Sequence, residues 1–242
     1  MTSTPTTKPK SKKLETAQSG TARAALLGIS DGLVTNVSLI LGVAASGVDP
    51  SFVRIAGIAS LIAGAFSMAV GEYISMQGQV ELLTSILDEE RAELHSHPDN
   101  VHRQLTSILV GDGVTKGTAH NAAVEIARDS DKAMSMYARG RLGINPNELG
   151  SAWGSAFSSF GMFAAGAAIP LIPWFFATDT TTSLFTLIAR GLSVVAALGI
   201  GAYLGLNTNG RWLRSALRQL LVLILAAGAT YLVGVLFHIN VA

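Results

Sequence analysis

The stretch LLGISDGLVTNVSLILGVAAS, residues 26–46, is apolar enough and long enough to cross a membrane, yet it contains an acidic residue, Asp31. A carboxylate near the bilayer interior costs about 2.5–3.5 kcal/mol on insertion scales, so it has to face protein or water. Two interpretations follow from this cost. Either Asp31 caps a helix at the membrane surface, with the span starting at Gly32, or it is a functional carboxylate inside the span.

The composition extends this picture to the whole chain of 242 residues. Hydrophobic residues make up 49% of the chain and charged residues 14%, which is the balance of a membrane protein rather than of a soluble domain. Cysteine is absent, which excludes disulfides, thiolate metal sites and cysteine nucleophiles. Because about 20 apolar residues cross the hydrocarbon core as a helix, the sequence predicts an all-α membrane protein with five transmembrane helices. The predicted spans are 24–46, 52–75, 152–177, 183–206 and 213–237.

The distribution of Lys and Arg predicts the orientation of these spans. With the N-terminus in the cytosol, 15 of the 17 basic residues fall on the cytosolic side, and only Arg54 and Arg190 fall at or within spans on the other side. Cytosolic loops of membrane proteins carry such an excess of basic residues. The C-terminal residues FHINVA should then lie outside. The expected organisation is a disordered cytosolic tail over 1–22, two transmembrane helices over 23–75, a cytosolic insert over 76–150 and three transmembrane helices over 151–242.

The insert between the second and third spans is polar and should be helical. No helix breaker follows the second span, so this helix should continue into the cytosol until Pro98 stops it. The three expected insert helices are this extension to about His95, a second from residue 99 or 100 to about 110, and a third from 118 to about 142. The connecting GDGVTKG, residues 111–117, is not a phosphate loop, because it lacks the GxxxxGK[ST] spacing.

Acidic residues gather on the first insert helix, where Glu90 and Glu93 lie three residues apart. Like charges on one helical face repel each other unless a cation intervenes. This cluster is either a solvated acidic face or a divalent-cation site, since carboxylate oxygens suit ions such as Mn²⁺ and Fe²⁺. The nearby histidines could contribute as further ligands. They are His95, His97 and His102.

The second span carries Met68, Glu72 and Met76 at intervals of four residues, which places a carboxylate between two thioethers on one helical stripe. A methionine in an apolar helix is usually packing material. A thioether binds borderline Fe²⁺ better than Mg²⁺ or Ca²⁺, whereas carboxylates bind all three ions. Together with Asp31, this stripe indicates either a pathway for a transition metal or a proton relay.

These residues resemble the vacuolar iron transporter family, and more closely its bacterial branch. The motifs that carry the resemblance are GISDGLVTNVSLILGVAAS, AGAFSMAVGEYIS, RLGINPNE, AAIPLIPW and NGRWLRSALRQ, which together span nearly the whole chain after the tail. The resemblance implies a homodimer that moves Fe²⁺ and often Mn²⁺ out of the cytosol in exchange for protons. It also implies a path at the dimer interface, lined by the first two helices, with Asp31 and Met68 as metal-binding residues.

The sequence departs from the family pattern at several acidic positions. Many eukaryotic members carry a glutamate at the position of Ser60, whereas this chain has Glu72. The family's cytosolic metal-binding glutamates match Glu90 and Glu93, but later acidic positions hold other residues, and the methionines lie near rather than on the family positions. These residues are Val101, Gln104 and Arg141 at the acidic positions, and Met134 and Met136. The insert is therefore expected to be a weakened metal-binding domain.

Two further features concern how the spans pack. Glycines recur in the first two spans, as is typical of helices that pack closely in membranes, and such packing would fit a dimer interface. These glycines are Gly28, Gly32, Gly42, Gly57, Gly64 and Gly71. Pro170 and Pro173 should kink the third span, so that neighbouring polar groups have to satisfy the freed carbonyls.

The function expected from these observations is metal transport without a cofactor, the metal being cargo. The alternative is a membrane-anchored metal-binding or interaction protein that transports nothing, although an anchor would have no use for Asp31 or Glu72. An enzyme is disfavoured, because the sequence contains neither an HExxH motif nor a Ser/His/Asp pattern. Partners other than metal ions, protons, lipid and a second copy are not expected, and nucleic acid is excluded. The membrane would be the plasma membrane in a bacterium and the vacuolar membrane in a eukaryote.

Overall fold

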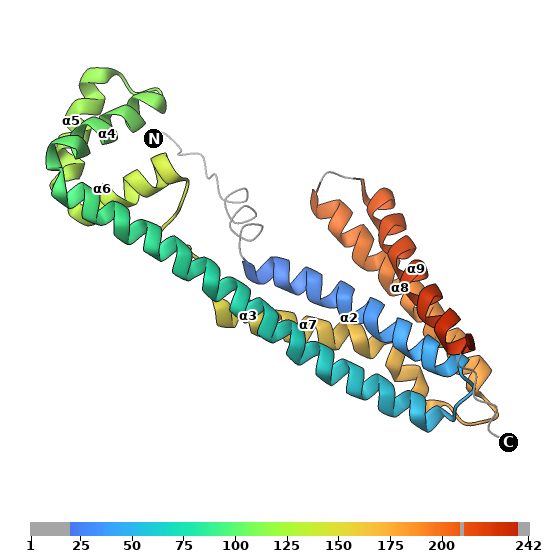
Figure 1. The fold of residues 1–242 in the computed structure, drawn as a ribbon. Coiled ribbons are helices and arrows are strands. Elements are labelled where there is room, and N and C mark those ends of the chain that lie inside the picture. Colours follow the sequence, from blue (N-terminus) through green and yellow to red (C-terminus); the bar gives the residue numbers. More distant parts are fainter. Residues whose placement is uncertain (1–19, 209–210, 237–242) are drawn as a thin grey trace, which may run out of the picture. The chain divides into compact units, whose positions relative to one another are not determined.

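The computed structural model describes residues 20–208 and 211–236, and every secondary-structure element in this part of the chain is helical (Figure 1). The elements are α2 (Gly20–Ala45), α3 (Pro50–Ser96), α4 (Pro98–Gly111), α5 (Lys116–Ala127), α6 (Ser130–Tyr137), the π-helix η1 (Ala138–Leu142), α7 (Ala152–Leu171), the 3₁₀-helix η2 (Ile172–Phe176), α8 (Thr182–Thr208) and α9 (Trp212–Leu236). Five segments of the described chain are long and apolar enough to cross a membrane, which confirms the five predicted spans. The protein is therefore an integral membrane protein.

The chain divides into two compact units. The first comprises Met1–Ile74 and Ala152–Ala242, and the second comprises Ser75–Ser151. Helix α2 begins at Gly20, so residues 20–22 are helical and do not belong to the predicted tail. The remainder of that tail, residues 1–19, and the C-terminal residues 237–242 lie outside the described residues.

In the first unit, α2 packs closely against α7. An added Cβ at Gly28 would lie 2.8 Å from the carbonyl oxygen of Ser159, and one at Gly32 would overlap the carbonyl oxygen of Phe163. One turn further on, Asn36 Nδ2 donates a hydrogen bond to the carbonyl oxygen of Ala167 at 2.6 Å. Both helices advance by four residues between successive contacts, so they run parallel. Small residues on α2 therefore permit a backbone-to-backbone contact along this face.

Helix α9 packs against another part of α2 in the same way. Thr230 Oγ1 donates to the carbonyl oxygen of Ser38 at 2.7 Å, and an added Cβ at Gly42 would lie 2.9 Å from the carbonyl oxygen of Thr230. The glycines of the first two spans thus pack within the chain. Of the six that the sequence singled out, only Gly71 has open space beside it. The expected close packing is confirmed, and its partners in the structure are other helices of the same chain.

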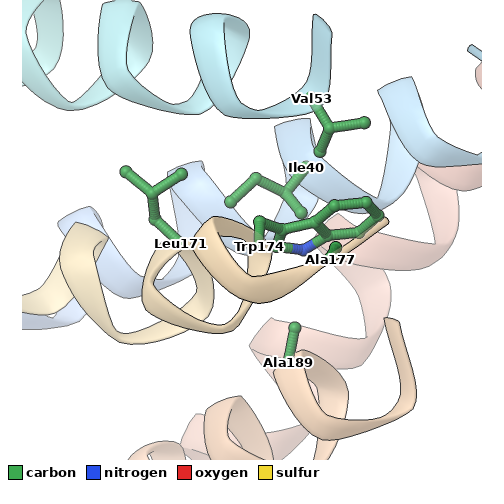
Figure 2. Close-up of a cluster of buried hydrophobic side chains, with 6 residues drawn as sticks. All are labelled: Ile40, Val53, Leu171, Trp174, Ala177 and Ala189. Carbon is green, nitrogen blue, oxygen red and sulfur yellow. The ribbon is translucent and has the colours of Figure 1, made fainter. Parts of the chain in front are cut away.

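The end of the first unit that contains the α2–α3 connection has an apolar core, shown in Figure 2. Its residues are Ile40, Val53, Leu171, Trp174, Ala177 and Ala189. Pro170 lies in the last turn of α7, and Pro173 lies in the 3₁₀-helix η2 that follows. Because proline removes a backbone donor, nearby carbonyls need other partners. Arg54 Nη1 donates to the carbonyl oxygens of Ala177 at 3.3 Å and Trp174 at 3.5 Å, so a polar side chain serves the carbonyls at the end of η2. The carbonyls that the prolines deprive of a donor lie four residues before each proline, so their satisfaction by polar groups stays a prediction.

In the second unit, α3 extends to Ser96 and α4 follows from Pro98, close to the predicted bounds. The third predicted insert helix is wrong as a single element, because the chain breaks at Asp129. The Asp129 side chain caps α6 by accepting hydrogen bonds from the backbone N–H groups of Asp131 at 3.1 Å and Lys132 at 3.2 Å. The insert thus contains the α3 extension, α4, α5 and α6 with η1, rather than three helices.

Candidate metal-binding site

Asp31 lies on a face of α2 that no other part of the described chain covers. Arg23, Leu27, Asp31 and Thr35 recur at four-residue intervals, so they form one stripe along the helix, and all four are exposed. We call these four residues the open stripe. Its position explains why the close contacts with α7 leave Asp31 accessible, since Gly28 and Gly32 lie on the buried side of α2.

The environment of Asp31 is poor in partners. Among the described residues its one hydrogen bond is with Thr35, whose Oγ1 donates to Asp31 Oδ1 at 3.3 Å. No basic side chain of the described chain lies within ion-pair distance of it. A carboxylate inside an apolar helix has to face protein or water. The interpretation of Asp31 as a cap at the helix start is wrong, because α2 begins eleven residues earlier, at Gly20.

Glu72 lies on the membrane-spanning part of α3 and is 9% exposed. Arg23 of the open stripe places Nη2 at 3.8 Å from Glu72 Oε2, while the Arg23 side chain itself remains 64% exposed. Among the described residues, Glu72 Oε2 has no hydrogen-bond donor. Arg23 therefore supplies a cation beside Glu72, but no close donor in the described chain saturates this oxygen. A divalent ion arriving at Glu72 would compete with the Arg23 guanidinium.

The contacts between α2 and α3 determine where the candidate residues lie along the helix axes. Arg23 lies level with Glu72, and Ile40 lies within van der Waals reach of an added Cβ at Gly57, so the two helices run antiparallel. Asp31 is eight residues from Arg23, which corresponds to about 12 Å along the helix axis. Met68 lies one turn from Glu72 in the same direction. Asp31, Met68 and Glu72 thus occupy successive levels along α2 and α3 instead of one coordination sphere.

Met68 is half-buried and packs against a small apolar cluster of Ala65, Phe163 and Ala167. This is the ordinary packing role of a methionine, and the described contacts give no independent sign of metal binding. The residues that the structure describes contain no group of three or more His, Asp or Glu side chains arranged to hold a metal ion. A metal site in the described membrane helices would therefore have fewer than three such side chains from one copy of the chain.

In the insert, Glu93 lines a groove of about 670 Å³ together with Tyr137, Arg103 and Arg141. Burial raises the pKa of Tyr137, and its hydrogen bond to Glu90 raises that pKa further. Glu90 thus accepts a hydrogen bond from a phenol, and Glu93 shares its groove with two guanidinium groups. Arg103 and Arg141 thus bring positive charge into the groove, although neither forms an ion pair with Glu93 among the described residues.

Sequence reasoning missed two polar residues of the membrane helices. Asn36 is fully buried: its amide nitrogen is bonded to Ala167, and its Oδ1 has no partner in the described part of the chain. Arg23 is the counter-ion of Glu72. An asparagine within an apolar span is a recognisable signal for a helix–helix contact. The Arg23–Glu72 pair joins residues 49 positions apart, so no local sequence pattern predicts this contact.

Comparison with known proteins places these features in a family. The family model described as VIT family matches residues 22–235. A vacuolar iron transporter of Acanthamoeba castellanii is 35% identical over 154 residues, which cover 63% of this chain and 55% of that protein. Vacuolar iron transporter 1 of Tulipa gesneriana is 27% identical over 86% of this chain and 84% of its own length, and that of Oryza sativa is 25% identical over 86% and 82%. The match from one end of the helical region to the other shows that this chain belongs to the VIT family.

Proposed function

We propose that the protein carries Fe²⁺, Mn²⁺ or both out of the cytosol in exchange for protons, through a path between two copies of the chain. The observation that carries this proposal is the exposed carboxylate of Asp31 in the middle of a membrane helix. The names of the relatives, vacuolar iron transporters, support metal-ion transport. To metal-ion transport the proposal adds three points: the ions are Fe²⁺, Mn²⁺ or both, the exchange is with protons, and the path lies in a dimer.

In the proposed dimer, a second copy of the chain packs over the open stripe. Facing lipid, Asp31 would cost about 2.5–3.5 kcal/mol or more. A two-fold symmetric dimer uses the same surface of both copies, so residues near the axis meet their own counterparts. Pairing the open stripes would place two Asp31 carboxylates across a shared path, with a Met68 thioether from each copy at an adjacent level.

Such a pair of carboxylates accounts for exchange with protons. Metal ions bind the deprotonated carboxylate, so protons and metal compete for the same oxygens. Two carboxylates carry two negative charges, which either one divalent ion or two protons neutralise. The site is then neutral in both loaded states, and an inward proton gradient drives the metal outward.

Arg23 and Glu72 would form the next level of the path. The proposed orientation puts this pair towards the cytosol, because 15 of the 17 basic residues then lie on that side. Cysteines introduced at Ser96 and at Ser183, both exposed, test the orientation. Impermeant thiol reagents should label these two cysteines from opposite sides of the membrane, whereas labelling from one side would refute the orientation.

Transport itself is tested with the purified protein in liposomes. Uptake of Fe²⁺ and Mn²⁺ and the accompanying proton flow should both be measurable, with Zn²⁺ and Ca²⁺ as comparison ions. The alternative function, an anchored metal-binding or interaction protein, predicts no flux of either kind. Metal flux without proton flow would retain transport and eliminate exchange.

A further inference from the structure

The insert contains a cavity that the proposed transport does not use. Its volume is about 160 Å³, and it lies between α3, α4 and the α5–α6 segment, all within the second unit. Its walls carry two imidazoles, of His95 and His102, and the thioether of Met134. Neither Glu90 nor Glu93 lines it. The cavity is thus distinct from the groove that contains Glu93.

The nitrogen atoms of the two histidines are poorly satisfied. His102 Nδ1 is buried and has no hydrogen-bond partner among the residues that the structure describes. Leaving a buried polar atom unpaired is unfavourable, so a ligand for it would be stabilising. The hydroxyl of Ser130 lies 3.4 Å from His95 Nε2, which orients that ring and leaves Nδ1 as its remaining nitrogen. A second hydrogen bond of this kind is what orients a metal-binding histidine.

The sulfur and the charges define which ion would fit. Met134 is only 4% exposed, so its thioether is held among packed side chains next to the cavity. Arg91 also lines the cavity, but its Nη2 lies 3.2 Å from Asp131 Oδ1, which partly neutralises its charge. None of the described residues that line the cavity is a carboxylate. A thioether favours soft ions such as Cu⁺, and imidazole suits copper as well as zinc, iron and nickel, whereas Mg²⁺ and Mn²⁺ are suited by oxygen ligands.

We propose that this cavity is a binding site for a soft monovalent metal ion, Cu⁺, with His95, His102 and Met134 as its ligands. The single positive charge of Cu⁺ keeps its repulsion from Arg91 smaller than that of a divalent ion. Cu⁺ binds few ligands, so the two histidine nitrogens and the methionine sulfur are sufficient for it. The site requires neither transport nor a second copy. A failure of the proposed transport function would therefore not affect this proposal, and the reverse also holds.

The test uses the full-length protein in detergent and Ag⁺ as a redox-inert stand-in for Cu⁺. Binding is measured by competition with a chelator of known affinity. His102→Ala and Met134→Leu should each weaken one Ag⁺ site at least ten-fold. The matched controls are His120→Ala and Met136→Leu, which change residues of the same type in the insert that do not line the cavity. Met68→Leu identifies any Ag⁺ bound by the thioether in the membrane helices.

Three results would overturn the proposal. One is Ag⁺ affinity that is the same in Met134→Leu, a nearly isosteric change, as in the unaltered protein. Another is displacement of Ag⁺ by equimolar Mn²⁺, which would mean a carboxylate site. The third is X-ray absorption of the Cu⁺-loaded protein without a sulfur neighbour at the metal. Should His102→Ala fail to fold, His95→Ala and Met134→Leu provide the same test, because His95 is exposed and its loss leaves the core intact.

Discussion

The two sides of α2 differ in what covers them. On one side Gly28, Gly32 and Asn36 are buried against α7, and small size and one amide hydrogen bond make the contact close. On the other side the open stripe presents Asp31 and Thr35 to whatever surrounds the chain. This difference indicates that the glycines allow the helices of one chain to pack closely, whereas the Asp31 carboxylate remains accessible to a ligand or a partner. Conservative changes on the two sides should therefore have different consequences.

The largest effect is expected for Asp31→Asn on the open side. This change keeps the shape of the side chain but removes its charge and its titration. Transport of Fe²⁺ and Mn²⁺ in liposomes should fall at least 100-fold, while the protein remains folded and elutes from size exclusion as the unaltered protein does. Undiminished transport coupled to protons in Asp31→Asn would refute the mechanism at its central residue.

Gly32→Ala on the closed side should act on stability instead. The new Cβ would overlap the carbonyl oxygen of Phe163, so α2 and α7 have to separate. Overpacking of this kind costs about 1–3 kcal/mol. Thermal unfolding followed by loss of the size-exclusion peak should show the decrease. Gly71→Ala is the control, because nothing lies within 4 Å of an added Cβ there, and an equal loss in both variants would contradict the packing argument.

Changes at the other path residues should alter ion preference by smaller factors. Glu72→Gln removes the carboxylate that Arg23 faces at 3.8 Å, and we expect KM for Fe²⁺ and Mn²⁺ to rise several-fold with some transport retained.

Met68→Leu preserves volume but removes the sulfur, so the rate of Fe²⁺ transport should fall more than the rate of Mn²⁺ transport. Parallel transport assays with both ions measure the ratio. Equal losses for the two ions would assign Met68 to packing alone.

The acidic residues of the insert should matter less than those of the spans. Glu93 already shares its groove with Arg103 and Arg141, so the insert should bind Fe²⁺ and Mn²⁺ weakly. The double change Glu90→Gln and Glu93→Gln is expected to reduce transport by about two-fold or less. Calorimetry on the full chain with Mn²⁺ should show no tight site that this double change removes. A tight, stoichiometric site lost in the variant would reverse this conclusion.

The smallest effect concerns pH and Tyr137. Burial and the hydrogen bond to Glu90 raise the pKa of this phenol above its usual value of about 10. The folded insert therefore retains the Tyr137 proton at a pH where the unfolded chain loses it. Its contribution to stability is complete below pH of about 10 and is lost as the pH rises through the folded pKa. Tyr137→Phe should flatten the alkaline part of a stability–pH curve, and an unchanged curve would exclude Tyr137 as its cause.

The sequence predicted the spans well because hydrocarbon imposes a strong, local requirement. A helix of fixed length is needed to cross it, and unbroken apolar runs such as 26–46 meet that requirement without help from elsewhere. The long α3 followed from the absence of a breaker before Pro98. The insert was harder, because Asp129 ends one helix and begins another through hydrogen bonds of its own side chain, and a polar residue at that position also fits a continuous helix.

The sequence by itself thus determined the class of protein, its five spans and the presence of an acidic residue within the first. Only the tertiary structure decided which side of α2 is covered, since apolar residues occur on every side of this helix and lipid and protein are equally apolar neighbours. It also decided that Arg23 faces Glu72, and that His95, His102 and Met134 share one cavity. These pairings join residues on different helices, and the distances between them depend on how the helices pack.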